Sequence, residues 1–409
     1  MIRYLLLLAL AGAACAEKAR FDNYRVHSVL PESEHHLRFL RELEENNDFL
    51  FWNDVRAVNA SVHIMVPPHK TAQFQEIVDF VGLKSEIYIN DVQKLIDAEN
   101  NNPAARSGIF GWNAYYRLND IYNWLDSLEA QYPGVVSVVV GGTTYEGREI
   151  RGVKVSYKAG NPGVFVEGGI HAREWISPAT VTYILNQLLT SQDPAIRDIA
   201  ENYDWYIFPS FNPDGYEYTH TTNRLWRKTR SRSSSLCYGA DPNRNWGFHW
   251  MDGGASSSAC SETYAGSSAF SEIEARSLSQ YISTIADKLS VYLSFHSYSQ
   301  YLLIPYGFSN AHISNYDTLM DIGKKAINSL SQRYGTKYVV GNIVDVIYVA
   351  SGGSMDWVRG EYGTPITYTY ELRDTGRNGF VLPAEQIIPT GEETLDSVLT
   401  ILQEARSVI

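Results

Sequence analysis

The sequence contains 409 residues, of which 44% are hydrophobic, and this composition excludes an intrinsically disordered chain. A chain of this length is expected to form two domains rather than one. The formal net charge is -12, from 34 basic and 46 acidic side chains, and no run of Lys and Arg is present, so nucleic acid is not expected as a partner.

The N-terminal segment MIRYLLLLALAGAACA, residues 1–16, is typical of a cleaved secretory signal. Arg3 precedes an apolar run that ends in the small residues Ala14 and Ala16, in an A-x-A-like pattern. This run is too short to cross a bilayer, and no later stretch reaches the roughly 18 apolar residues of a membrane helix. We therefore expect a secreted, extracellular protein that does not insert into a membrane.

Residues 21–90 alternate short β-rich runs with two amphipathic segments, in the order β, α, β, β, α, β. Ser33 can cap the first helix, which has leucines on one face. The expected strands are 24–30, 49–55, 61–66 and 86–89, and the expected helices carry Leu37, Leu40 and Leu43 or Phe74, Ile77, Val78 and Val81. This order predicts a small ferredoxin-like α+β domain without a catalytic signature of its own.

The polar stretch AENNNPAARSGIF, residues 98–110, is typical of a linker, because the segment 100–103 interrupts helix. Arg106 is the expected cleavage site of a trypsin-like protease, although an ordinary linker arginine fits the local sequence equally well. The predicted parts of the chain are therefore a signal over 1–16, a first domain with its connecting segment over 17–106, and a second domain over 107–409.

From residue 111 onward, longer alternations predict a single α/β domain with a mixed β-sheet flanked by helices. The expected strands are 135–140, 150–155, 163–169, 205–211, 289–296 and 366–372, and the expected helices are 118–130, 178–189, 272–289, 316–334 and 385–408. Of three cysteines, Cys15 belongs to the signal, so Cys237 and Cys260 are predicted to form a disulfide in an oxidising compartment. Two free thiols are the alternative.

A candidate metal site begins in the segment GGIHAREW, which follows a glycine-bounded apolar strand. His171 and Glu174 lie three residues apart there, close enough to reach one ion. His296 closes the apolar strand VYLSFHSYSQ, and strand ends are where α/β folds place their chemistry. Taken singly, the first two residues could be a surface pair and the third a core histidine.

Six motifs stand in the same order as in the metallocarboxypeptidase family of the pancreatic A and B type: HAREWI, TNRLWRKTRS, PNRNW, SFHSYSQ, YVASGGSMDW and YTYELRDTGR. The chain resembles this family over essentially its whole length after the signal. The resemblance implies one Zn²⁺ per chain, held by His171, Glu174 and His296, with water at the open fourth position. This His, His, Glu ligand set is that of carboxypeptidase A.

The resemblance also implies two catalytic side chains. Glu371, in the run ITYTYELRD, corresponds to the general base that takes a proton from the attacking water, and a salt bridge to Arg373 or another cation is the alternative. Arg227 corresponds to the cation that stabilises the oxyanion. Its neighbours Arg224, Lys228 and Arg230 are expected to form a solvated face.

An exopeptidase must recognise a free α-carboxylate, and a planar guanidinium can do so bidentately. The resemblance assigns this task to Arg244, with Asn243 and Tyr348 as supporting donors. Tyr348 taken alone would be ordinary core packing. Arg173 and Tyr298 correspond to residues that contact the peptide farther from its end.

Met355 stands at the position that separates the two branches of the family, where B-type enzymes carry an acidic residue to pair with Lys or Arg. Methionine offers an apolar wall, and Ile347, Ala350 and Thr369 are its expected neighbours. This predicts A-type release of apolar or aromatic C-terminal residues. The order of preference among them stays open.

The first domain resembles the family's activation segment, which implies an inactive precursor that a trypsin-like protease converts to the enzyme. A catalytically inactive peptide-binding homologue is the alternative, but Glu371 and the complete ligand set argue against it. A serine hydrolase would need G-x-S-x-G, and a zincin H-E-x-x-H, and both motifs are missing. A monomer is expected, and Asn59 begins the N-glycosylation triplet N-A-S.

Overall fold

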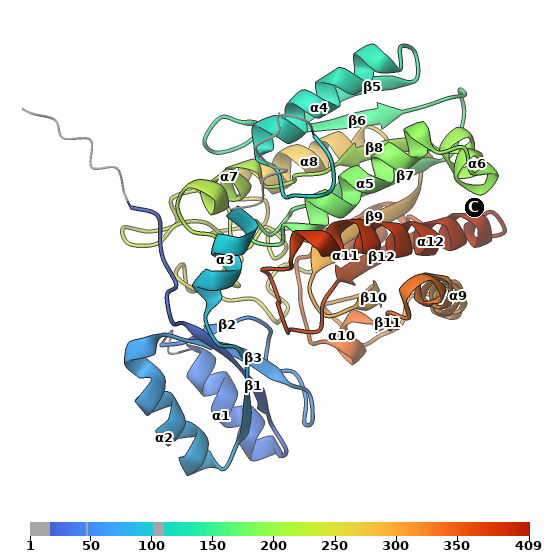
Figure 1. Ribbon diagram of the computed structural model, residues 1–409. Coiled ribbons are helices and arrows are strands. Elements are labelled where there is room, and N and C mark those ends of the chain that lie inside the picture. The colour runs from blue at the N-terminus through green and yellow to red at the C-terminus, as the bar shows by residue number, and fades with distance from the viewer. Residues whose placement is uncertain (1–16, 46–47, 101–109) are drawn as a thin grey trace, which may run out of the picture.

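A computed structural model describes residues 17–45, 48–100 and 110–409 (Figure 1). The predicted secretory signal and the predicted cleavage site at Arg106 lie outside these residues. In Figure 1 the blue N-terminal domain lies beside a larger α/β domain, and α3 connects the two.

The N-terminal domain contains a four-stranded antiparallel sheet in the order β2-β3-β1-β4, with α1 and α2 packed on it. The elements are β1 (Arg25–Leu30), α1 (Glu34–Glu45), β2 (Leu50–Phe51), β3 (Val62–Val66), α2 (Thr71–Val81), β4 (Lys84–Ile89) and α3 (Val92–Asn100). Ser33 accepts a hydrogen bond from the backbone N–H of His36 at the start of α1. The predicted order of strands and helices is therefore confirmed.

One strand of this domain is much shorter than predicted. The expected strand 49–55 is reduced to Leu50–Phe51, because the following residues leave the sheet and contact the larger domain. The Trp52 side chain packs on Phe380, with ring centroids 5.3 Å apart. The helix α3 was not predicted, and it extends into the first residues of the predicted linker 98–110 before it ends at Asn100.

The larger domain contains an eight-stranded mixed sheet in the order β11-β10-β12-β9-β7-β8-β6-β5. Its strands are β5 (Val136–Thr143), β6 (Glu149–Val155), β7 (Gly163–Gly168), β8 (Asp204–Phe208), β9 (Leu289–Ser297), β10 (Tyr301–Ile304), β11 (Val339–Asn342) and β12 (Ile366–Leu372). The central strands β12, β9, β7 and β8 are parallel, and β5, β6 and β10 pair antiparallel with their neighbours. All six strands predicted here are present, and β10 and β11 were missed.

Helices cover both faces of this sheet (Figure 1). They are α4 (Leu118–Gln131), α5 (Ile176–Thr190), α6 (Pro194–Asn202), α7 (Pro213–Thr221), α8 (Ile273–Ser283), α9 (Tyr316–Tyr334), α10 (Ile343–Val346), α11 (Ser354–Tyr362) and α12 (Ile387–Ala405). Strand alternation divides the core: Val164 and Val166 of β7 pack with α5 and α12 on one face, and Phe165 packs with α8 and α11 on the other. The predicted helix 272–289 is shorter than expected and ends at Ser283.

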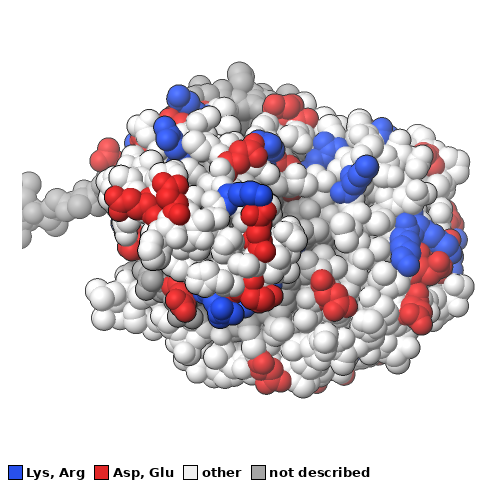
Figure 2. Space-filling model, turned by 90° about the horizontal axis from the view of Figure 1, so that it is seen from below, with Lys and Arg blue, Asp and Glu red and all other residues white. Residues whose placement is uncertain are grey.

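Cys237 and Cys260 form the predicted disulfide, with Cα atoms 5.2 Å apart. None of the helices in the described residues is long and apolar enough to cross a membrane. Asn59 lies exposed in the turn before β3. Figure 2 shows acidic and basic side chains interspersed over the face of the molecule seen from below.

Candidate active site

The site lies at the carboxyl ends of three neighbouring parallel strands. His171 follows β7, His296 is the penultimate residue of β9, and Glu371 is the penultimate residue of β12. The register of β9 and β12 pairs His296 directly with Glu371. Residues distant in sequence therefore meet at the edge where parallel sheets place ligands.

The nitrogen and oxygen atoms of His171, Glu174 and His296 converge on one point, and all three side chains are buried. The His171 Nδ1 atom lies 2.8 Å from Glu174 Oε1 and 3.2 Å from His296 Nδ1, and His296 Nδ1 lies 3.3 Å from Glu174 Oε2. Ligands about 2.0 to 2.1 Å from a tetrahedral ion lie about 3.3 Å from one another. The donor set and its spacing therefore fit zinc.

The electrostatics of this cluster favour a cation. Burial alone would raise the pKa of the Glu174 carboxyl, but the imidazoles of His171 and His296 hold that pKa well below its ordinary value. Glu174 Oε2 also accepts a hydrogen bond of 3.1 Å from the backbone N–H of Ser297. Glu174 is therefore held as a carboxylate in the orientation that faces both imidazoles.

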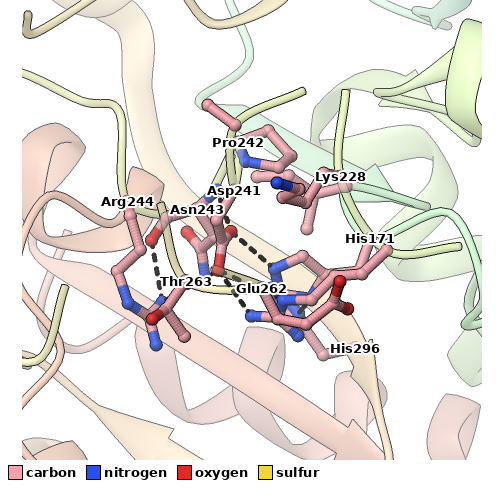
Figure 3. A network of polar contacts seen from close by, with 12 residues as sticks. His171, Lys228, Asp241, Pro242, Asn243, Arg244, Glu262, Thr263 and His296 are labelled. Carbon is pink, nitrogen blue, oxygen red and sulfur yellow. Dashed lines mark hydrogen bonds and ion pairs between the residues drawn. The ribbon is translucent and has the colours of Figure 1, made fainter. Parts of the chain in front are cut away.

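Asp241 contacts the ring nitrogen of His171 that faces away from the other two ligands. The sequence did not predict this residue as part of the site. Its Oδ1 atom lies 3.1 Å from His171 Nε2 (Figure 3). Its Oδ2 atom accepts a hydrogen bond of 2.7 Å from Arg227. Burial would raise the pKa of Asp241, but Arg227 and His171 hold that pKa well below its usual range. The only sequence signal for this contact is the acidic residue that precedes PNRNW.

Glu371 lines the same cavity as the three ligands. Its burial raises the pKa of the carboxyl to about 8, although the nearby His296 imidazole acts in the opposite direction. The alternative of a salt bridge to Arg373 is wrong, because the guanidinium of Arg373 pairs with Glu393. Glu371 thus faces the cavity without a paired cation in the described residues.

Arg227 projects toward the ligands, with its Nη1 atom 3.9 Å from Glu174 Oε1. Its neighbours do not form the predicted solvated face. Arg224 is completely buried, its guanidinium bonds to Glu99 of α3 at 2.8 and 3.0 Å, and Lys228 is 3% exposed and donates to a backbone carbonyl. Arg230 stacks on Tyr218, with its guanidinium carbon 3.6 Å from the ring centroid. For Arg224 and Lys228 the prediction failed because their partners, Glu99 and the backbone carbonyl of Ala259, are remote in sequence.

Arg244 presents its guanidinium to the cavity and is bonded mainly to neutral groups. It donates to the backbone carbonyls of Gly254 at 2.9 Å and Asn243 at 3.0 Å, and to the Tyr348 hydroxyl at 3.2 Å. Asp241 is 3.9 Å away. The Asn243 carboxamide oxygen accepts a hydrogen bond from the backbone N–H of Ser354, which fixes its orientation.

Gly254 sets the position of the Tyr348 segment. Its φ is +64°, and an added Cβ would lie 1.5 Å from the Val349 carbonyl oxygen, so only glycine allows this approach. Beyond Tyr348, Met355 is buried, and its sulfur lies 3.5 Å from the Thr369 hydroxyl. Ile347 and Ala350 line the same cavity, as predicted.

Every predicted catalytic, metal or substrate residue except Arg173 lines this one cavity. The Arg173 side chain lies under Phe380, with its guanidinium carbon 4.1 Å from the ring centroid, and contacts Glu262 at 3.3 Å. Tyr298 is buried, and its hydroxyl lies 2.8 Å from Nδ1 of His63 in the N-terminal domain. The N-terminal domain also contributes Trp52, Asn53, Asp54 and Arg56 to the lining of the cavity.

Solved structures with the same overall architecture include two that span nearly the whole chain. Thrombin activatable fibrinolysis inhibitor superposes with a TM-score of 0.88 at 29% identity, covering 95% of this chain and 100% of that one. Carboxypeptidase A from Helicoverpa armigera superposes with a TM-score of 0.86 at 28% identity, covering 95% of this chain and 98% of that one.

Curated relatives match at higher identity. Zinc carboxypeptidase A 1 of Anopheles gambiae is 51% identical over 98% of this chain and 94% of its own length, and carboxypeptidase A2 of Mus musculus is 39% identical over 98% of each. The family described as Zinc carboxypeptidase matches residues 121–397, and Carboxypeptidase activation peptide matches residues 27–99. The chain therefore belongs to the zinc carboxypeptidase family, as the zymogen with its activation peptide, and its zinc ligands are His171, Glu174 and His296.

Proposed function

We propose that the protein is a secreted A-type procarboxypeptidase, whose mature domain releases apolar or aromatic residues from the C-termini of peptides. The observation that carries this proposal is one cavity that joins the zinc ligands, Glu371, Arg244 and a wall built around Met355. In this proposal, a trypsin-like protease cuts near Arg106 and separates the domain 17–106 from the enzyme 107–409.

Glu371 is the proposed general base. Zinc, when bound, supplies a Lewis acid and lowers the pKa of a water molecule that it coordinates. Glu371 then accepts a proton from the attacking water and passes it to the leaving amine. Burial raises the pKa of Glu371 to about 8, and a nearby dication lowers it. Because the base must be ionised, kcat/KM is expected to fall as the pH drops through the pKa that Glu371 has in the zinc-loaded enzyme.

Arg227 is the proposed oxyanion stabiliser. A fixed cation beside the metal stabilises the charge that develops on the carbonyl oxygen more than it stabilises the neutral amide. Burial would lower the pKa of the guanidinium, but Asp241 and Glu174 raise it, so the side chain stays charged. Asp241 also holds it in place through a hydrogen bond of 2.7 Å, so little rearrangement is needed during the reaction.

Arg244 is the proposed anchor for the α-carboxylate of the substrate. Its contacts leave a buried guanidinium without a carboxylate closer than 3.9 Å in the described residues, and the free acid of a peptide can supply that partner. The Tyr348 hydroxyl, 3.2 Å from the guanidinium, and the Asn243 carboxamide are placed to add hydrogen bonds. This requirement makes the enzyme an exopeptidase.

A-type specificity rests on the pocket rather than on the names of relatives. Two A-named relatives match the full chain, but carboxypeptidase B of Astacus astacus is also 48% identical over 70% of this chain and 95% of its own length. Met355 supplies a polarisable, uncharged wall, and Thr369 contacts its sulfur. An uncharged wall of this kind favours apolar side chains over Lys or Arg.

Latency follows from the position of the N-terminal domain. Asp54 lines the cavity beside Tyr348 and Arg244. Burial raises the pKa of the Tyr348 hydroxyl, and the Asp54 carboxylate raises it further. We infer that Asp54 occupies the region that the α-carboxylate of a substrate needs, so that the intact zymogen excludes peptides.

Glu99 and Arg224 form a buried ion pair that holds the activation peptide to the enzyme. Both side chains are almost completely buried, and the guanidinium also donates to the backbone carbonyls of Arg173 and Phe380. Glu99 lies near the end of α3, just before the segment that is cut in the proposed activation. The contact therefore survives cleavage and delays release of the domain.

Glu371→Gln is expected to lower kcat at least about 100-fold, because the amide cannot accept the proton. Release of Phe from a blocked dipeptide is measured after trypsin treatment, and zinc content is measured on the same sample. Zinc should remain stoichiometric. Glu361→Gln, at an exposed carboxylate of α11, is the control and should keep wild-type turnover. Near-normal turnover of Glu371→Gln would mean that another group accepts the proton.

Asp241→Asn is expected to lower the zinc affinity about 10-fold to 100-fold, because the carboxylate orients and polarises the His171 ring. The affinity is measured by competition with a chelator. Asp126→Asn, at a half-exposed carboxylate that pairs with Arg151, serves as the control. An Asp241→Asn affinity equal to that of the control would contradict the role given to Asp241.

Met355→Asp is expected to change the preferred C-terminal residue from an apolar one to Lys or Arg. A carboxylate in the pocket wall pairs with a cationic side chain, whereas an apolar side chain leaves it unpaired. The wild-type enzyme should release Phe or Leu at least about 10-fold faster than Arg, and the variant should reverse that order. The measurement is kcat/KM for blocked dipeptides that end in Phe, Leu or Arg. A wild-type enzyme that releases Arg faster than Phe refutes the A-type assignment.

Glu99→Gln is expected to shorten the time between trypsin cleavage and full activity, because it leaves the buried Arg224 guanidinium unpaired, at a cost of about 3 to 5 kcal/mol. The cleaved chain is followed by activity and by size-exclusion chromatography. Glu86→Gln removes the exposed pair with Arg377, which is 3.1 Å long, and should change the delay little. Equal delays in the two variants would argue against the ion pair.

A further inference from the structure

An acidic residue also lies in the wall of the specificity pocket, next to Met355. Asp356 lies in the first turn of α11, is 1% exposed and belongs to the lining of the cavity. Its Oδ2 atom accepts hydrogen bonds from the backbone N–H groups of Gly307 at 2.7 Å and Phe308 at 3.2 Å. Its Oδ1 atom has no hydrogen-bond partner in the described part of the chain.

An unpaired oxygen on a buried carboxyl group is costly and therefore unusual. Among the described residues, Asp356 forms no ion pair, and its charged or titratable neighbours His249 and Arg244 act on it only at longer range. Burial raises the pKa of Asp356 to about 7. Burial thus disfavours the charged form of Asp356, which has no cation paired with it in the described residues.

Three polar groups near Met355 already have partners. The Thr369 hydroxyl contacts the methionine sulfur at 3.5 Å, and the Asn243 carboxamide oxygen accepts a hydrogen bond from the Ser354 N–H. The Ser354 hydroxyl donates to Glu167 at 2.7 Å. The free oxygen of Asp356 is therefore an acceptor next to Met355 that has no partner in the described part of the chain.

We propose, on the basis of the function above, that Asp356 is a specificity-determining residue whose Oδ1 atom accepts a hydrogen bond from the far end of the C-terminal side chain. A terminal Tyr can donate that hydrogen bond through its phenol, whereas a terminal Phe leaves the oxygen unpaired. A donor-bearing aromatic side chain gains about one hydrogen bond in the bound state, equivalent to about 10-fold in kcat/KM. The enzyme therefore prefers Tyr to Phe.

The test uses the trypsin-activated full chain and blocked dipeptides that end in Phe, Tyr or 4-aminophenylalanine. The aromatic amine of the last substrate is chiefly a donor, whereas a phenol can also accept. The wild-type enzyme should favour both donor substrates over Phe by about 10-fold. In Asp356→Asn the amide carbonyl can keep the Gly307 and Phe308 contacts, and the amide nitrogen then faces the substrate as a donor.

Because a donor would then meet a donor, Asp356→Asn should lose most of the preference for 4-aminophenylalanine over Phe. The ratio of two substrates on one enzyme sample is independent of how much enzyme folds. Glu361→Gln, at an exposed carboxylate of the same helix α11, is the control, and the ratio should persist in that variant.

A ratio that is unchanged within about 2-fold in Asp356→Asn, or a wild-type preference for Phe over both donor substrates, would overturn the role of Asp356. The second outcome needs no variant and so holds even if Asp356→Asn fails to fold. Failure of the wild-type enzyme to release any of the three residues would instead refute the proposed carboxypeptidase function.

Discussion

Asp241 is a completely buried carboxylate whose negative charge depends on two neighbours, one on each oxygen. His171 and Arg227 are those neighbours, so a single side chain orients a metal ligand and the proposed catalytic cation together. The backbone N–H of Asn243 donates a third hydrogen bond to Asp241 and fixes the start of the segment that carries Arg244. The positions of the zinc ligand His171, the proposed oxyanion cation Arg227 and the proposed carboxylate anchor Arg244 are thus all fixed by contacts with one buried carboxylate.

Parallel strands supply the rest of this arrangement. The carboxyl ends of β7, β9 and β12 meet at one edge, and the fixed register of β9 and β12 places Glu371 opposite His296. A shift of one residue in that register would turn Glu371 to the other face of the sheet. The core on both faces therefore also keeps the proposed base Glu371 beside the zinc ligand His296, because packing on each face specifies the register.

The sequence alone predicted the long, periodic elements and the residues carried by motifs. Helix α9 begins and ends at the predicted residues, and His171, Glu174 and His296 converge as expected. The short strands β10 and β11 have too few residues for a detectable alternation. Asp241 and the burial of Arg224 depend on contacts across the fold, such as the bond between Arg224 and Glu99, 125 residues apart in sequence. No local pattern encodes such contacts.

The activation peptide was predictable as a domain, but its contacts with the enzyme were not. The sequence predicts a strand over 49–55, but β2 ends at Phe51 and Trp52 leaves the sheet. In the folded chain the same residues enter the cavity. After Phe51, contacts with the larger domain, such as that of Trp52 with Phe380, replace strand pairing, and a sequence pattern within the first domain cannot predict them.

The disulfide between Cys237 and Cys260 encloses Asp241, Asn243, Arg244 and Gly254 in one covalent ring. The groups proposed to bind the end of a substrate are therefore tethered by a bond that forms and persists only under oxidising conditions. A copy of the chain retained in a reducing compartment would lack this tether even with its zinc ligands intact. The redox state of the surroundings thus limits where full catalytic competence can develop.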